Sequence, residues 1–229
     1  MSASHELGLR IRPVAAHGGN FLSGSSAGLP NEVRTKVMKR DNHTCVYCGF
    51  RALRFQEVRP ADPDSAPRQN RPEDWVTVCH MCDQCLSLER AGFMGEGLLI
   101  WMPEMSQPDL NHLVRALYVG RSSDDAVAEA AKRGIDALRS RRDDAKRRLG
   151  TDDPLILATV LGDYATTEEG RSHDEKLDGI RFLSLDRRIQ RTPTGEVDRF
   201  PDMIAYWKSK EGPFGEVPLN QWTSLAERL

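Results

Sequence analysis

The chain has 229 residues, of which 39% are hydrophobic and 29% are charged, and its formal net charge is −2. This length fits one large domain or two small ones, and the hydrophobic fraction is sufficient for a compact core. The near-neutral balance disfavours a dedicated nucleic-acid binder, which usually carries a basic surplus. No apolar run approaches the roughly 18 residues that a helix needs to span a bilayer.

Residues 1–30 predict an N-terminal arm that is partly disordered. Leu9–Val14 alternates in polarity and predicts an edge strand, whereas residues 17–30 are rich in Gly, Ser and Ala. Met1–Arg12 has no apolar stretch of the kind found in secretory signals. We therefore expect a cytoplasmic protein, in a compartment where thiols remain reduced.

Residues 31–104 contain the elements expected of a small zinc-binding subdomain. Helical spacing of apolar residues, strand-like alternation and loop-forming prolines divide this part of the chain. The expected elements are a helix over Asn31–Arg40 with Asn31 as N-cap, strands over Ala52–Val58 and Leu98–Met102, a loop over Asp62–Pro72, the segment Asp74–Val78 that leads into the second cysteine pair, a helix over Cys82–Arg90 and a glycine-rich turn over Gly92–Gly97.

All five cysteines lie between Cys45 and Cys85. The pairs Cys45/Cys48 and Cys79/Cys82 can place four thiolates around one Zn²⁺ in a tetrahedron, which leaves no open position for water or substrate. The spacing therefore predicts one structural zinc ion. Cys85 also forms a Cys-x-x-Cys pair with Cys82, so it is an alternative to Cys79 or Cys82 as a ligand. A role in redox chemistry and a ligand role for His80 are weaker alternatives.

Residues 105–229 predict a mainly helical half that packs on the zinc-binding subdomain, which makes the fold class α+β. Ser106 caps a helix whose apolar face is expected at Leu110, Leu113, Val114 and Leu117. Further predicted segments are a long helix over Ser123–Leu149 ended by Gly150, a helix over Asp153–Leu161, helix then loop over Thr166–Leu185, and short helices over Pro201–Lys210 and Leu219–Leu229.

The order helix, Cys-x-x-Cys, strand, loop, Cys-x-x-Cys and helix over Val33–Arg90 resembles zinc-stapled HNH endonucleases. Catalysis in that family needs a histidine at the end of the strand, usually after Asp, and further Asn or His side chains in the loop and after the second cysteine pair. Here Glu57 takes the place of the histidine and Gln56 that of its Asp partner, while Asp74 and Asp83 fill the other two positions. The resemblance implies an HNH-like fold without HNH catalysis, so no catalytic residue is predicted.

A second resemblance covers more of the chain. The cysteine triplet Cys79–Cys85, the glycine-rich turn and the segment Leu98–Asn111 resemble the DotN (IcmJ) family of Dot/Icm-type IVB secretion systems, best over Val33–Val119. The resemblance implies a non-enzymatic adaptor, cytoplasmic and held at the inner membrane by its partner. Its expected partners are the C-terminal extension of the coupling ATPase and other coupling-complex subunits, with which it builds a platform that receives effectors. The zinc ligands that carry over are Cys45, Cys48, Cys79 and Cys82.

The alternative function is a metal-dependent HNH-type endonuclease or a DNA-binding module. Its support is the HNH-like order of elements and a locally basic stretch, which can contact phosphates. A solvated surface, or one that meets an acidic partner segment, is the favoured explanation of the same charges. The basic residues are Arg34, Lys36, Lys39, Arg40, Arg51, Arg54 and Arg59. Trp101, Trp207 and Trp222 are either core residues or anchors for a partner.

Overall fold

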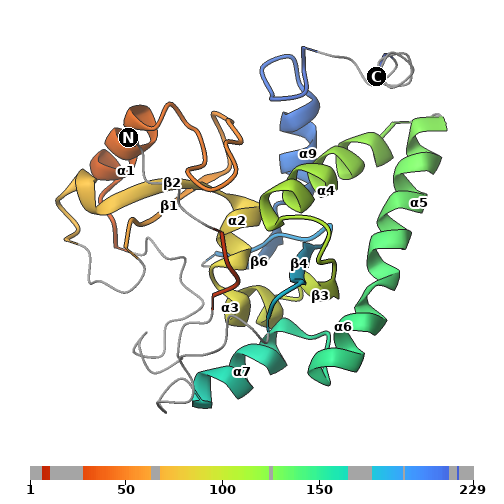
Figure 1. Cartoon of the computed structure of the whole chain (residues 1–229). Helices are drawn as coiled ribbons and strands as arrows, with labels where there is room; N and C mark the ends of the chain where they lie inside the picture. The colour runs from red at the N-terminus through yellow and green to blue at the C-terminus, as the bar shows by residue number, and fades with distance from the viewer. Residues whose placement is uncertain are drawn as a thin grey trace.

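A computed structural model of the protein describes residues 7–10, 28–62, 68–123, 126–164, 177–192, 194–216 and 221. Within these residues the fold is α+β and combines helices with three small antiparallel sheets of two strands each (Figure 1). None of the described helices has the length and apolar character of a membrane span. The elements are α1 Asn31–Arg40, β1 Gln56–Pro60, a 3₁₀ turn Pro72–Asp74, β2 Trp75–Cys79, α2 His80–Cys85, α3 Leu88–Phe93, β3 Gly97–Trp101, α4 Gln107–Arg121, α5 Ala126–Ser140, α6 Arg142–Leu149, α7 Pro154–Tyr164, β4 Ile180–Ser184, β5 Ile189–Thr192, β6 Gly195–Asp198 and α9 Phe200–Lys208.

The β1–β2 hairpin leads directly into α2. Gln56 lies opposite Cys79 and Pro60 opposite Trp75 in the antiparallel register. Helix α1 packs on this hairpin through a small apolar cluster of its own, which includes Val37 and Val58, both fully buried. The predicted helix over Asn31–Arg40 is confirmed, but its N-cap is Pro30, because Asn31 is already the first helical residue. The first predicted strand is displaced toward the C-terminus and begins at Gln56.

Strands β3 and β4 form the sheet at the centre of the molecule (Figure 1). Leu99 lies opposite Phe182, and both side chains are fully buried. The other edge of β3 is closed by connecting segments, since Leu99 donates its amide to the carbonyl of Asp152 at 2.8 Å. The prediction of a helix followed by a loop over Thr166–Leu185 is wrong at β4. A five-residue strand whose partner lies some 80 residues earlier has little local signal to reveal it.

Two predicted helices are each divided in the structure. The predicted helix over Cys82–Arg90 is α2 and α3, separated at Leu86 and Ser87, where the guanidinium of Arg59 binds the Leu86 carbonyl and the Ser87 hydroxyl. The predicted helix over Ser123–Leu149 is α5 and α6 with a break at Arg141. At that break the Arg141 carbonyl accepts hydrogen bonds from the amides of Ala145 in α6 and Trp101 in β3.

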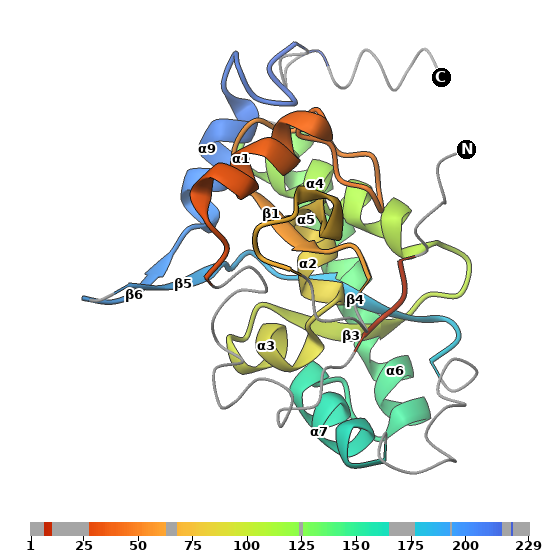
Figure 2. The ribbon, with the colours of Figure 1, turned by 90° about the vertical axis from the view of Figure 1, so that its left-hand side faces the viewer.

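The C-terminal part adds a hairpin that sequence patterns did not predict. Strands β5 and β6 form a two-stranded ribbon that projects from the body of the molecule (Figure 2). The predicted helix after it is confirmed as α9, and the predicted C-cap at Gly150 is confirmed by its left-handed backbone (φ 79°). The predicted Leu219–Leu229 helix and most of the Leu9–Val14 strand lie outside the described residues. The division at residues 30 and 104 stays a prediction.

Close contact between α3 and α7 depends on Gly92. A Cβ added at this glycine would lie 2.4 Å from the amide nitrogen of Leu155 in α7. We therefore expect Gly92→Ala to lower the free energy of unfolding by about 1–3 kcal/mol, as overpacking does, despite the better helix propensity of Ala. Urea denaturation measures the change. The matched control is Gly162→Ala in α7, where no atom lies within 4 Å of the added Cβ. If both variants were equally stable, the close approach of Gly92 to Leu155 would not contribute to stability.

Candidate metal centre

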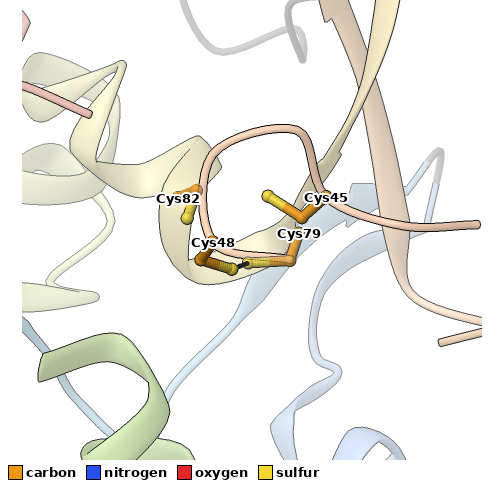
Figure 3. Close-up of side chains that lie close together, drawn as sticks. All are labelled: Cys45, Cys48, Cys79 and Cys82. Atoms are coloured by element: carbon orange, nitrogen blue, oxygen red, sulfur yellow. Dashed lines mark hydrogen bonds between the residues drawn. The ribbon is translucent and has the colours of Figure 1, made fainter. Parts of the chain in front are cut away.

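Four cysteine sulfurs converge between the β1–β2 hairpin and α2 (Figure 3). The Sγ atoms of Cys45, Cys48, Cys79 and Cys82 all lie within 4.8 Å of one another, and those of Cys48 and Cys79 are 3.6 Å apart. A tetrahedral Zn²⁺ with Zn–S bonds of about 2.3 Å requires sulfur–sulfur distances of about 3.8 Å. The cluster therefore has the donor set and the size of a four-thiolate zinc site, as the sequence predicted.

The first cysteine pair lies on a tight loop after α1. Gly49 donates its amide to the carbonyl of Cys45 at 2.9 Å, and Cys45 donates its own amide to Phe50 at 3.0 Å. The positive φ of Gly49 (72°) suits glycine, because a side chain is strained in this conformation. Gln56 fixes the loop to β1, since its amide donates to the carbonyls of His43 and Phe50 at 2.7 and 3.1 Å.

The second pair lies at the junction of β2 and α2. Cys79 is the last residue of β2, and Cys82 is in the first turn of the helix that follows. A strand that runs straight into a helix places positions 79 and 82 on the same side of the junction. The geometry therefore favours Cys79 and Cys82 as the partners of the first pair.

The alternative ligands lie apart from the cluster. Cys85 is buried and donates its thiol to the Met81 carbonyl at 3.2 Å, and burial raises the pKa of this thiol. His80 is also buried, and burial lowers its pKa to about 4. Neither belongs to the group of side chains within reach of one ion.

The four thiols influence one another strongly. Hydrogen bonds from the neighbouring thiols, first that of Cys45, lower the pKa of Cys48. The pKa of Cys82 is raised, first by its hydrogen bond with Cys45. A divalent cation would compete with these shared protons and take the sulfurs as thiolates, so metal affinity depends on pH.

Helix α4 contributes two hydrogen-bond donors to the sulfurs that sequence patterns did not identify. Asn111 Nδ2 lies 3.4 Å from Cys82 Sγ, and Arg115 Nη2 lies 3.4 Å from Cys79 Sγ. The predicted apolar face of this helix is partly wrong, because Leu113 and Leu117 are only half-buried whereas these two polar side chains are 1% exposed. Polar residues spaced four apart within a helix that is otherwise apolar are the signal that could have revealed them.

Arginines contact the three acidic residues at the positions where the resemblance to HNH endonucleases places catalytic side chains. Arg188 donates to Glu57 at 3.0 Å, and Arg68 donates to Asp74 at the same distance. Asp83 is buried against a third guanidinium, that of Arg59, with Nε and Oδ1 2.5 Å apart. Although burial raises the pKa of Asp83, this guanidinium holds it below its ordinary value.

Trp207 belongs to the core. It is 2% exposed and packs edge-on against Phe50 of the cysteine loop, with ring centroids 5.9 Å apart. Trp101 is half-buried beneath the guanidinium of Arg148, 3.9 Å from the ring centroid. Trp222 lies outside the described residues. Of the proposed anchors, Trp207 therefore stabilises the fold and is not available on the surface.

The separation of Cys85 from the cluster gives a direct test of the ligand set. We expect Cys85→Ser to retain about one zinc ion per chain, because a single tetrahedral site needs only the other four thiolates. Cys79→Ser, the same chemical change at a cluster position, should lose the metal and the cooperative unfolding transition. Elemental analysis and thermal denaturation measure both properties. Loss of zinc from Cys85→Ser, or a folded zinc-free Cys79→Ser, would contradict this ligand set.

The chain was compared with known proteins. No family model matches it. It is 31% identical over 152 residues to the Type 4 apparatus protein DotN of Legionella pneumophila subsp. pneumophila (strain Philadelphia 1), a match that covers 65% of this chain and 70% of that protein. Identity at this level over most of both chains confirms the relationship expected from the Cys79–Cys85 triplet and the segment after it. The chain belongs to the DotN family.

Proposed function

We propose that the protein is a non-enzymatic adaptor subunit of a type IVB secretion system. In this role it binds the C-terminal extension of the coupling ATPase and helps build the platform that receives effector proteins. It works in the cytoplasm and is held at the inner membrane by that partner. The observation that carries the proposal is the similarity over 152 residues to a relative named as a Type 4 apparatus protein.

The metal centre supports a structural role for the zinc-binding part of the chain. Four thiolates would occupy all positions of a tetrahedral Zn²⁺, so the ion would leave no position for water or substrate. What the ion supplies is folding free energy, because it holds the loop around Cys45 against the start of α2. We expect the partner to bind a surface formed by the loop around Cys45 and the start of α2, whose relative position the ion would fix.

The contacts of the former catalytic positions also support a non-enzymatic role. A general base needs a lone pair that can reach the proton it abstracts. Glu57 is instead paired with Arg188, and Asp83 with Arg59, while the side chain of Gln56 is used to hold backbone carbonyls. The three side chains are thus engaged within the chain, although burial raises the pKa of Glu57 to about 7.

The nucleic-acid alternative loses support from the contacts of its basic residues. Arg59 is 3% exposed and paired with Asp83, so it faces the interior. Arg40 donates to Asp41 and to the carbonyls of Pro72 and Trp75. Two members of the predicted basic stretch are therefore engaged within the chain, which weakens a continuous phosphate-binding face.

Affinity purification from the native cell tests the adaptor proposal. We expect the tagged full-length protein to enrich the coupling ATPase, as identified by mass spectrometry, and a peptide of its C-terminal extension to bind the purified chain. Cys85→Ser should retain both interactions, and Cys79→Ser should lose them, because only the latter removes the zinc that orders the surface. Purification without the ATPase, together with no binding of the peptide by the zinc-loaded wild type, would overturn the proposal.

An endonuclease assay tests the alternative. We expect no cleavage of single- or double-stranded DNA by the zinc-loaded protein with Mg²⁺ or Mn²⁺, because the carboxylates that could bind a second metal are paired with arginines. The matched variant is Glu57→Ala, which removes the carboxylate at the catalytic position. Cleavage by the wild type that disappears in this variant would establish the endonuclease function and contradict the adaptor role as stated.

A further inference from the structure

Arg115 of α4 is a buried arginine without a carboxylate partner among the described residues. Its side chain is 1% exposed, and its guanidinium lies over the Phe50 ring, 3.7 Å from the ring centroid. The polar contacts of its terminal nitrogens are with Cys79 Sγ at 3.4 Å and His112 Nδ1 at 3.3 Å, while Nε has no hydrogen-bond partner. Every other arginine described as buried contacts an acidic side chain.

A guanidinium stays charged in proteins, so its burial is unfavourable unless an opposite charge lies nearby. The neighbouring aromatic rings and the imidazole of His112 provide only partial compensation. The cysteine cluster provides the missing charge, since Zn²⁺ bound by four thiolates has a formal net charge of about −2. The Nη2–Sγ contact with Cys79 places the positive charge directly beside this anionic centre.

We propose that Arg115 is the counter-cation of the four-cysteine zinc site and raises its affinity for zinc. The inference rests on the metal centre proposed above. It adds that tight zinc binding also needs Arg115, which is not itself a ligand. Groups that hydrogen-bond to metal ligands typically change metal affinity by about 10–100-fold when they are removed.

A second hydrogen-bonded chain on the same helix supports this arrangement. Gln107 accepts from the amide of Phe182 in β4 at 2.8 Å and donates to Asn111 Oδ1 at 2.9 Å. With its oxygen engaged in this way, the amide of Asn111 directs its Nδ2 to Cys82 Sγ. Residues 107, 111 and 115 follow one another at four-residue intervals, so they form a polar row on one face of α4. This row connects the zinc site to the central β3–β4 sheet.

Zinc affinity in a set of charge variants tests the proposal. Competition with a chromogenic chelator measures the dissociation constant of the full-length wild type, Arg115→Met, Arg115→Gln and Arg115→Lys. We expect the two neutral variants to bind zinc about 10–100-fold more weakly. Arg115→Lys, which keeps the charge, should stay much closer to the wild type. Arg115→Gln keeps a hydrogen-bond donor without the charge, and it replaces Arg115→Met in the test if that variant does not fold.

Arg121 provides the matched control on the same helix. Its guanidinium also lies over an aromatic ring, that of Tyr118 at 4.9 Å, but it pairs with Asp186 and contacts no sulfur of the described residues. Arg121→Met should therefore keep the zinc affinity of the wild type. The sulfur-to-cobalt charge-transfer bands of the Co²⁺-loaded proteins provide a second readout. They should shift in the neutral Arg115 variants and not in Arg121→Met.

The possible results distinguish a failure of the Arg115 proposal from a failure of the zinc-site proposal. Wild-type affinity in Arg115→Gln would overturn the proposal, and so would an affinity of Arg115→Lys as weak as that of the neutral variants. A wild type that binds no zinc would instead overturn the metal centre. The expected order, with Arg115→Lys close to the wild type and both neutral variants weaker, supports a role through charge, because loss of packing alone would not follow the charge of the side chain.

Discussion

The convergence of four cysteine sulfurs is the constraint on which the rest of the structure depends. Two of them lie on a short loop after α1 and two at the junction of β2 and α2, so a metal ion would join two segments that are separate in the sequence. The same convergence concentrates negative charge in the interior once the sulfurs are thiolates. The surrounding structure must therefore supply N–H donors and positive charge, and helix α4 does so with Asn111 and Arg115.

Features encoded in short stretches were predictable from the sequence. The cysteine spacing identified the four sulfurs that meet, a short apolar run located β3, and helical patterns located α1 and α9. The N-terminal capping of α4 is confirmed, since Ser106 Oγ accepts the amide of Asp109 at 3.2 Å. Each of these features depends on residues within a few positions of one another, where backbone preferences and side-chain periodicity act directly.

Features that depend on distant partners were not predictable. Strand β4 forms because β3 offers an open edge, and α2 and α3 separate because Arg59 binds the carbonyl and hydroxyl at the break. The candidate site shows the same limit, because its sulfurs follow from spacing whereas Arg115 becomes recognisable only when α4 is placed against Cys79. An arginine within an amphipathic helix is ordinarily a solvent-exposed residue, and only its burial reveals a different role.

Arginines from the second half of the chain contact anionic groups in the first half. The part before residue 105 contains the cysteine cluster and the carboxylates of Glu57 and Glu96. The part after it supplies Arg115 to the cluster, and Arg188 to the two carboxylates at 3.0 and 3.3 Å. Of the two carboxylates only Glu96 is fully buried, and removal of the partner of a buried charge leaves that charge uncompensated and is strongly unfavourable. Arg188 directly precedes β5, so its ion pairs with Glu57 of β1 and with Glu96, the residue before β3, connect the start of β5 to both sheets.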